Sequence, residues 1–376
     1  MTSNPFFPIA SYCSSHGWGG LEMNVSRFLQ WMQGRGWPVF LCADPKSEIM
    51  SHANTLAIPT RGIHCTSQIS ALWKARTLAK TASEDGVRVL IVHQSPDLLI
   101  CSIAKRWSGG RLKIVFSQNM HLGNKRDPIH AWQYRKIDAF ISPLPILAEQ
   151  ARRQTVVPTE KIHVIPHGIE QDRFIQRVDR IEARRELGLP LDATIIGIIG
   201  RLDPKKGQHV GIRALARLHA NGLRPHLLVV GNPTIGEGDR YQQHLHTLVN
   251  ELGLTTSVHF RPYLDKPETA YGAMDIFVLT SQSETYGLVT IEAMTSGLPV
   301  IGTNSGGTVD IIDHERNGLR FPPDDETALA AALARYLTDP TLATKVAAQG
   351  RHDALNRYSH TAQCEAWEAL LREIVQ

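Results

Sequence analysis

The feature that most constrains the fold of this chain is a repeated alternation of short apolar runs with segments of helical periodicity. Between residues 21 and 33, apolar side chains recur three and four positions apart, as on the buried face of a helix. The first series has predicted strands at 8–13, 39–43, 87–92, 113–117 and 139–143, and predicted helices at 21–33 and 72–84. This alternation predicts a parallel sheet covered by helices on both faces.

A second series begins after Ile165-Pro-His-Gly-Ile169, where a proline and a glycine interrupt regular structure. Its predicted strands are 194–199, 226–230, 258–260, 276–279 and 299–302, its predicted helices are 207–220, 241–251, 288–296 and 326–338, and a last helix is predicted at 359–374. We therefore expect two doubly wound α/β domains. Ligands of such sheets bind beyond the carboxyl ends of the strands, so a cleft between the domains is the expected site.

The length and composition agree with this architecture. The 376 residues suffice for two domains, and 42% apolar with 20% charged residues argues against a disordered or fibrous chain. The apolar runs fall far short of the roughly 20 residues that a membrane span needs, and the N-terminal residues show no export signal. Five widely spaced cysteines without a C-x-x-C pair argue against a disulfide framework or a zinc site. We expect a cytoplasmic protein.

The two halves of the chain differ in charge. Residues 1–170 contain 19 basic and 11 acidic residues, whereas residues 171–376 contain 21 and 25. A basic first half suits an acidic acceptor, a phosphate or an anionic membrane surface, but ordinary scatter of solvated side chains explains it equally well. Lys105-Arg106-Trp107 suits peripheral contact with the cytoplasmic face of a membrane, or it simply ends a helix. No basic and aromatic module predicts nucleic-acid binding.

The most informative motif is the segment from Ser283 to Val300, which carries Glu284 and Glu292. Glu284 lies in the predicted strand-to-helix loop, and Glu292 lies about one turn into the following helix, so its side chain can point back toward that loop. The backbone N–H groups of Tyr286, Gly287 and Leu288 would lie at the helix N-terminus, where anions bind. One carboxylate can bind sugar hydroxyls and the other a ribose diol. Alone, the pair could equally be a helix cap and an unrelated surface residue.

Two further motifs lie at predicted strand-to-helix loops. Gly200-Arg-Leu-Asp-Pro-Lys-Lys-Gly207 places Arg201 and Lys206 directly after a strongly apolar strand, which suits a diphosphate better than a merely solvated basic loop. Gly19 and Gly20 lie at the first such loop of the chain, where glycine lets a ligand approach the backbone closely. A plain tight turn is an equally good explanation of the two glycines.

Together these motifs resemble those of the retaining GT-B glycosyltransferases of family 4, also called group 1. The resemblance rests on S-E-x-Y-G-L-x-x-x-E-A-M-x-x-G-x-P-V-I at 283–301, G-R-x-x-x-K-K-G at 200–207, G-G-x-E at 19–22, the hinge segment and Ser305-Gly-Gly307. It implies two Rossmann-like domains facing a central cleft. Residues 1–168, with a C-terminal helix at about 356–376 that crosses back, would bind the acceptor, and residues 169–355 would bind a nucleotide-sugar donor.

The resemblance also implies roles for individual residues. Arg201 and Lys206 would neutralise the departing diphosphate, and Gly19-Gly20 would face it from the other domain. Glu284 would contact the donor sugar, and Glu292 would contact the ribose. The backbone of Tyr286, Gly287 and Leu288 would bind sugar and phosphate oxygens. The base would pack near Arg261-Pro-Tyr263, although the family usually has a glycine-containing turn there. The expected donor is a UDP-, GDP- or ADP-sugar.

Glycosyl transfer builds positive charge on the sugar ring and negative charge on the leaving phosphate, which cationic side chains and a helix N-terminus can stabilise. No D-x-D signature is placed to hold a metal, so we expect no metal cofactor. The sequence also offers no clear nucleophilic carboxylate opposite Glu284, in agreement with the front-face displacement presumed for this family. In that mechanism the leaving phosphate helps to deprotonate the acceptor.

The acceptor side is less specific. Many relatives carry a histidine near the reacting sugar, and its position falls on Asn119, with His121 two residues later. His121 is a candidate catalytic or orienting residue, and His93 and Asp97, which follow another strand, are candidates to face the acceptor. Lys125 and Arg126 are candidates to hold an anionic acceptor, such as a glycan or lipid-linked intermediate of cell-surface polysaccharide or lipopolysaccharide synthesis.

Two other classes of function remain open on these residues. A nucleotide-sugar epimerase of the same architecture would use Asp97 or His121 as its acid or base and would convert the sugar without an acceptor. A non-catalytic nucleotide-sugar-binding protein would bind the donor without hydrolysis or transfer. The full set of donor-side motif residues argues against this last possibility.

Overall fold

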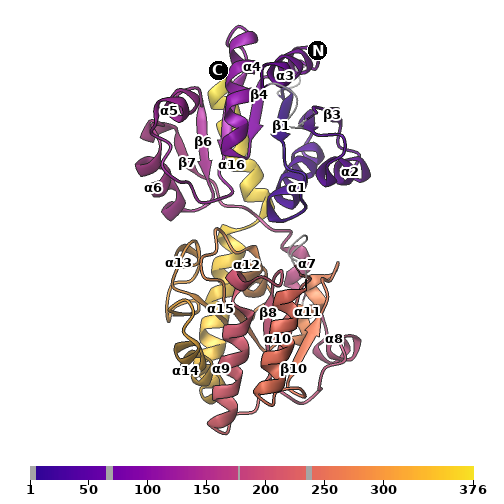
Figure 1. Cartoon of the computed structure of the whole chain (residues 1–376), viewed down its shortest axis with the longest axis vertical. Helices are drawn as coiled ribbons and strands as arrows, with labels where there is room; N and C mark the ends of the chain where they lie inside the picture. Colours follow the sequence, from indigo (N-terminus) through magenta and orange to yellow (C-terminus); the bar gives the residue numbers. More distant parts are fainter. Residues whose placement is uncertain (1–5, 65–70, 177, 234–238) are drawn as a thin grey trace. The chain divides into compact units, whose positions relative to one another are not determined.

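The computed structural model describes residues 6–64, 71–176, 178–233 and 239–376. Contacts within the chain define two units. The first unit contains the N-terminal part of the chain up to His167, together with His360–Gln376. The second unit is Gly168–Ser359. The chain therefore leaves the first unit next to the predicted hinge and returns to it with its last helix, α16 (His360–Val375), drawn in yellow in Figure 1.

Among the described residues, the first unit contains a sheet of seven parallel strands in the order β3-β2-β1-β4-β5-β6-β7. The strands are β1 (Ile9–Cys13), β2 (Val39–Ala43), β3 (Thr60–Gly62), β4 (Val89–Val92), β5 (Lys113–Ser117), β6 (Ala139–Ser142) and β7 (Ile162–Val164). The helices that connect them are α1 (Gly20–Gly34), α2 (Glu48–Thr55), α3 (Ala71–Glu84), α4 (Leu98–Trp107), α5 (Pro128–Tyr134) and α6 (Pro145–Gln154).

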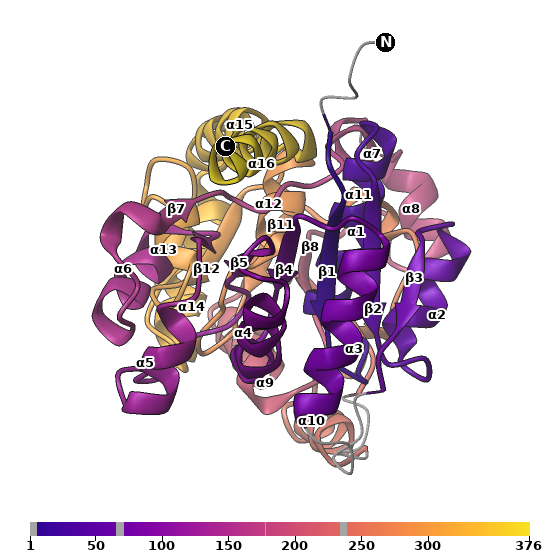
Figure 2. The same ribbon diagram turned by 90° about the horizontal axis from the view of Figure 1, so that it is seen from above.

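Alternate residues along these strands pack into two separate cores, one on each face of the sheet. Ile9 and Val89 face a core formed with helices α1, α2 and α16, to which Trp367 contributes. Ala10 and Leu90 face a core formed with α3, α4, α5 and α6. Helices α3 and α4 lie side by side on this second face (Figure 2). Burial on both faces explains why β4 is uninterruptedly apolar.

The second unit contains, among its described residues, a sheet of six parallel strands in the order β10-β9-β8-β11-β12-β13. The strands are β8 (Ile195–Ile199), β9 (His226–Val230), β10 (Val258–Arg261), β11 (Ile276–Leu279), β12 (Val300–Thr303) and β13 (Leu319–Phe321). The helices are α7 (Asp172–Ile175), α8 (Arg180–Glu186), α9 (Gln208–Ala220), α10 (Arg240–Glu251), α11 (Pro267–Ala273), α12 (Leu288–Thr295), α13 (Thr308–Ile311), α14 (Glu326–Thr338) and α15 (Pro340–Arg357).

These two sheets confirm the predicted pair of Rossmann-like domains. In each sheet the strand order reverses beside the first strand of the unit, β1 or β8, and all strands run in the same direction. The loops that follow β1, β4 and β5 therefore share one edge of the first sheet, and those that follow β8, β11 and β12 share one edge of the second. A doubly wound sheet binds its ligands at such an edge.

Candidate active site

The loops after β8 and β11 are tied together at the carboxyl edge of the second sheet. Thr280 Oγ1 donates to the Lys206 carbonyl at 2.7 Å, and the Gln282 N–H donates to the Lys205 carbonyl at 2.9 Å. The end of β12 joins them, because Oγ1 of its last residue, Thr303, donates to the Ser281 carbonyl at 2.7 Å. The cationic loop and the Glu284 loop are thus parts of one surface.

Lys206 and Glu284 meet on this surface. Lys206 Nζ lies 2.6 Å from Glu284 Oε2, and Ser281 Oγ donates to the same oxygen at 3.1 Å. Lys206 belongs to a short 3-10 turn, Pro204–Lys206, that Asp203 caps by accepting the Lys205 N–H. Both charged side chains are partly buried, at 30% and 16% exposure. The ion pair therefore remains within reach of a ligand.

The backbone of Glu284 is held by the loop after β12. The Gly307 N–H donates to the Glu284 carbonyl at 2.7 Å. Gly306 has a φ of +54°, and a Cβ at this position would overlap the same carbonyl oxygen. Only glycine satisfies both the left-handed backbone and the close approach. The predicted Ser305-Gly-Gly307 motif therefore fixes the position of Glu284.

Helix α12 begins directly after the Glu284 loop. Gly287 precedes it with a φ of +85°, and Leu288 is its first residue. The N–H groups of Tyr286, Gly287 and Leu288 lie at or just before this helix N-terminus, which carries partial positive charge. The Tyr286 ring is buried and packs edge-on against Tyr358. An anion beside Lys206 would thus meet a second source of positive potential.

Glu292 lies one turn into α12 and is only 8% exposed. Its Oε2 accepts a hydrogen bond from the Tyr271 hydroxyl on α11 at 2.7 Å. The two glutamates of the motif therefore have different surroundings: Glu284 pairs with a cation, and Glu292 is held by a neutral donor inside the protein.

Arg201 follows β8 and has an exposed side chain. Its backbone is fixed, because the buried Gln208 donates from Nε2 to the Arg201 carbonyl at 2.7 Å. We find no hydrogen-bond or ion-pair partner for the Arg201 guanidinium among the described residues. It is thus available to bind an anion, on the same loop as Lys206.

The predicted base-binding loop follows β10 on the same edge. Tyr263 is 55% exposed, and its N–H is held by Asn232 Oδ1 at 2.9 Å. Arg261 is directed elsewhere, because its guanidinium donates to the carbonyls of Leu187 and Gly188. Of these two side chains, that of Tyr263 is therefore the more accessible.

In the first unit, Gly19 and Gly20 lie where β1 leads into α1. Gly20 is the first residue of the helix, and Gly19 precedes it with an extended backbone. A Cβ at Gly20 would meet no atom within 4 Å, so close packing inside the unit does not require a glycine there. Its exposed N–H, at the start of α1, has the geometry to bind an anion.

His93 and Asn119 meet at the same edge of the first sheet. His93 Nε2 lies 3.2 Å from Ser11 Oγ, and Nδ1 lies 3.5 Å from Asn119 Nδ2. His93 is almost fully buried, and burial, with a smaller contribution from His167, lowers its pKa to about 3. At neutral pH this histidine is uncharged.

Asp97 also follows β4, at the end of a short 3-10 turn, Ser95–Asp97. It is 2% exposed, and burial raises its pKa to about 6, although the Ser14 backbone N–H donates to Oδ2 at 3.4 Å. Burial thus outweighs the hydrogen bonds from Ser14 and the charge of Lys74, which lower the pKa of this carboxyl group.

The other predicted acceptor residues, His121, Lys125 and Arg126, come later in the loop that follows β5. His121 is exposed, and the carbonyl before it, that of Met120, accepts from Gln118 Nε2. The guanidinium of Arg126 donates to the carbonyls of Arg152 and Arg153 at the end of α6. Lys125 also contacts this region, since its N–H donates to the Gln154 carbonyl at 2.7 Å, and its Nζ lies 3.4 Å from His130 Nε2. The structure therefore joins His93, Asp97 and Asn119 at one edge but places Lys125 and Arg126 against α6.

Sequence reasoning missed three residues that hold these sites together. Tyr271 lies 21 residues before Glu292, in a short and largely buried helix where a tyrosine is typical of simple packing. Ser281 and Ser14 are small loop residues whose contacts depend on distant strands. Only for Ser281 did a local signal exist, because it follows β11 three positions before Glu284.

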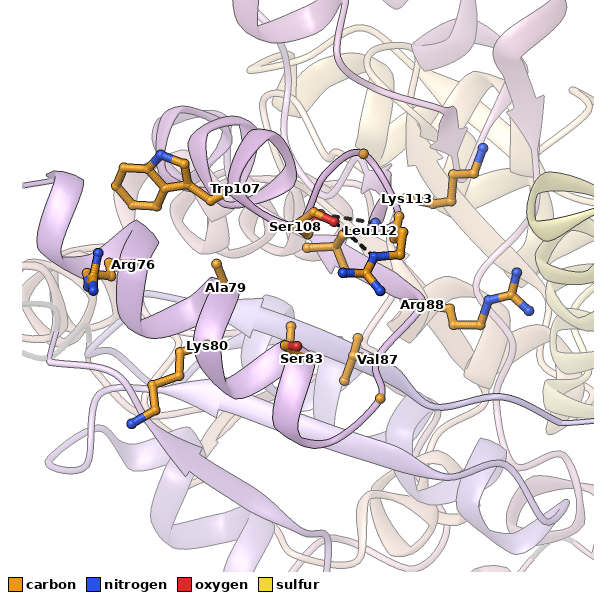
Figure 3. A pocket seen from close by; sticks show the side chains of 14 residues that line it. Arg76, Ala79, Lys80, Ser83, Val87, Arg88, Trp107, Ser108, Leu112 and Lys113 are labelled. Atoms are coloured by element: carbon orange, nitrogen blue, oxygen red, sulfur yellow. Dashed lines mark hydrogen bonds between the residues drawn. The ribbon is translucent and has the colours of Figure 1, made fainter.

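A basic pocket of 970 Å³ lies at the opposite, amino edge of the first sheet, between the ends of α3 and α4 (Figure 3). Its basic lining residues are Arg76, Lys80, Arg88, Arg111 and Lys113, and Trp107 also lines it. Lys80 and Arg88 point to opposite sides of the pocket. The Arg88 guanidinium also donates to the Val375 carbonyl. The cations are spread over a broad surface and do not converge on one point.

Comparison with family models shows that the chain is of the glycosyltransferase class. Residues 18–173 match the model of Glycosyltransferase Family 4, and residues 179–353 match that of glycosyl transferases group 1. The chain belongs to the group 1 glycosyltransferases of family 4. This confirms the resemblance drawn from the motifs.

A curated relative agrees with this assignment, and solved structures share the fold. The D-inositol 3-phosphate glycosyltransferase of Stackebrandtia nassauensis is 38% identical over 210 residues, which cover 54% of this chain and 47% of that protein. The matched segment thus spans about half the length of this relative. A glycosyltransferase of Rickettsia africae has the same GT-B fold, with a TM-score of 0.89, 18% identity and 99% of both chains covered. Anabaena HepE, solved with UDP and glucose, gives a TM-score of 0.80 at 21% identity, over 97% of this chain and 99% of that one.

Two features are absent from the residues that the structure describes. No helix in 6–64, 71–176, 178–233 or 239–376 is both long enough and apolar enough to cross a membrane. Over the same ranges, no three or more His, Cys, Asp or Glu side chains come together as a metal site.

Proposed function

We propose that this protein transfers a glycosyl group from a nucleoside-diphosphate sugar to a glycan or lipid-linked acceptor, with retention at the anomeric carbon. The observation that carries the proposal is the contact of Lys206 with Glu284 at 2.6 Å, next to the N-terminus of α12. A cation, a carboxylate and a helix N-terminus together suit a sugar diphosphate, which has hydroxyls at one end and negative charge at the other.

The chemistry follows from these charges. As the glycosyl bond breaks, negative charge grows on the β-phosphate, and Lys206, Arg201 and the α12 N-terminus stabilise it. Glu284 accepts hydrogen bonds from the sugar hydroxyls and orients the ring. The departing phosphate takes the proton of the acceptor hydroxyl as that oxygen attacks the same face. Because the chain supplies this positive charge itself, we propose that transfer needs no metal and continues in the presence of EDTA.

The donor is proposed to be a UDP-, GDP- or ADP-sugar. Glu292 would hold the ribose hydroxyls, and Tyr263 would stack on the base. Anabaena HepE was solved with UDP and glucose, which makes UDP-glucose the first donor to test, although the likeness to HepE extends only to the fold.

Two chemical classes of acceptor call for parallel assays. A role in cell-surface polysaccharide or lipopolysaccharide synthesis predicts a glycan or lipid-linked acceptor. The activity for which the Stackebrandtia relative is named instead indicates an inositol phosphate. On the protein's side, we propose that Asp97, His93 and Asn119 face the acceptor and that His121 helps to orient it.

We further propose that the enzyme works in the cytoplasm and contacts the cytoplasmic face of a membrane through its basic first unit. Trp107 is 47% exposed beside the basic pocket of Figure 3, an arrangement that suits an anionic lipid surface. Co-sedimentation with vesicles that contain anionic lipids, compared with neutral vesicles, tests this. Equal binding to both would refute it.

The test of the proposed reaction has three steps. Thermal shift with UDP, GDP and ADP identifies the base, because a ligand that binds only the folded state raises the melting temperature. Transfer is then assayed with the corresponding sugars and both acceptor classes, and NMR of the product reports the anomeric configuration. Inversion would refute the mechanism. Sugar conversion without an acceptor would instead indicate an epimerase, and binding with no turnover would indicate a non-catalytic protein.

A further inference from the structure

Tyr271 is a buried residue to which neither the motifs nor the proposed reaction gives a role. Its side chain is 0% exposed on α11. Its hydroxyl donates to Glu292 Oε2 at 2.7 Å and also approaches the Val289 carbonyl at 3.2 Å. Both acceptors belong to α12, so this hydroxyl links α11 to the helix that carries Glu292.

The position of the phenol is fixed by packing on several sides. Its ring meets Phe174 edge-on at 5.7 Å between centroids, and it lies 6.0 Å from the ring of Phe277. The next residue, Gly272, is so close to Val178 that a Cβ on it would lie 2.9 Å from the valine Cβ. A helix packed this tightly gives the hydroxyl little freedom to move away from Glu292.

Tyr271 is the donor of this hydrogen bond. Burial and the neighbouring Glu292 carboxylate raise the pKa of Tyr271 well above its usual range, so the phenol keeps its proton. A neutral donor that faces a carboxylate inside the protein makes a charge-assisted hydrogen bond, which is stronger than one between neutral groups. It also compensates the carboxylate for lost hydration.

We propose that Tyr271 is a positioning residue that holds the Glu292 carboxylate in the orientation needed to bind the two vicinal hydroxyls of the donor ribose. This rests on the proposed function, in which Glu292 contacts the ribose. Tyr271 itself touches no ligand. By fixing one carboxylate oxygen before the donor arrives, it removes the cost of ordering that side chain on binding.

The experiment compares the ribose and dideoxyribose forms of the same nucleoside diphosphate. Dissociation constants of UDP, GDP and ADP, and of their 2′,3′-dideoxy counterparts, are measured by calorimetry with the wild-type protein and with Tyr271→Phe. For the nucleotide that binds, we expect Tyr271→Phe to weaken the ribose form about 10-fold and the dideoxy form less than about 2-fold. In the Glu292→Ala background, Tyr271→Phe should then have little further effect.

Tyr336→Phe is the matched control. Tyr336 is also buried, at 3% exposure, and its hydroxyl donates to the Val300 carbonyl at 3.2 Å in the same unit. We expect this variant to bind both nucleotide forms as the wild type does. An equal loss for both forms in Tyr271→Phe, or no loss for either, would overturn the positioning role while the proposed function stands. A wild type that binds none of the three nucleotides would instead refute the proposed donor, and this inference with it.

Discussion

The carboxyl edges of the two sheets carry opposite kinds of chemistry. In the second unit, Lys206 and Glu284 form a partly exposed ion pair beside a helix N-terminus. In the first unit, His93 and Asp97 are almost fully buried, and burial favours the neutral form of each. The same fold thus presents an accessible ion pair at one edge and buried titratable groups at the other. We infer that the edge of the second unit suits a diphosphate and that the edge of the first unit suits a hydroxyl acceptor.

The largest expected effect comes from removing the cation of the charged edge. Lys206→Ala should lower the rate of transfer by about 10²–10³-fold, because the leaving phosphate loses a stabilising charge. The control is Lys205→Ala at the adjacent position, whose side chain is exposed and whose backbone alone makes the contacts described here. The measurement is the steady-state rate of transfer of both variants. Equal losses would mean that the motif acts only through its general charge.

The next largest effect should come from the glycine that fixes Glu284. Gly306→Ala adds a Cβ that overlaps the Glu284 carbonyl and strains a φ of +54°, so we expect a loss of about 3 kcal/mol in the free energy of unfolding. Gly222→Ala separates the two causes, because Gly222 has a φ of +85° but open space around its Cβ position. That variant should lose only about 1 kcal/mol. Urea denaturation of both measures the difference.

In the buried edge of the first unit, the expected effect depends on pH. The pKa of Asp97 is about 6 in the folded chain, against about 3.9 when unfolded, so its ionised form destabilises the fold above pH 6. This cost disappears as the pH falls from about 6 to about 4. Asp97→Asn should therefore stabilise the protein at pH 8 by up to about 2–3 kcal/mol, and by progressively less toward pH 4. Urea unfolding of both proteins over this range measures the trend.

His93, at the same edge, should change the stability of the protein with pH in the opposite direction. Its pKa falls to about 3 in the folded chain, so the neutral histidine contributes stability that is present above about pH 6.5 and is lost as the pH falls below that value. His93→Gln should make the protein less sensitive to acid over the range in which Asp97→Asn loses its advantage. If the free energies of unfolding of the two variants changed with pH in parallel, burial would not be what sets these pKa values.

The smallest effect is expected at Arg126. Its guanidinium binds the last carbonyls of α6 at 2.8 and 3.1 Å, so Arg126→Ala should cost about 1 kcal/mol of stability with little change in transfer. Thermal unfolding and an acceptor titration of the same variant test this together. A raised KM for the acceptor at unchanged stability would instead indicate that Arg126 binds the acceptor.

Much of this arrangement can be predicted from the order of residues alone. The apolar run at 276–279 and the glycine after Tyr286 place Glu284 in a loop and start a helix at Leu288, and the structure has both. The edge strands β3 and β7 were missed, because each has only three residues and is partly exposed. Helix α15 was also missed. Lys105-Arg106-Trp107 ends α4, as one of its two explanations predicted, but continuous apolar residues obscure where this helix begins.

The sequence by itself determined the two parallel sheets and the loops that carry the charged residues, because the alternation of strands and helices and the position of glycine are local properties of the chain. Only the tertiary structure decided which side chains meet. The contacts of Tyr271 with Glu292, Lys206 with Glu284 and His93 with Asn119 each join residues 21 or more positions apart. Such contacts depend on strand order and helix packing, and these set both the direction of each carboxylate and the degree to which water is excluded from it.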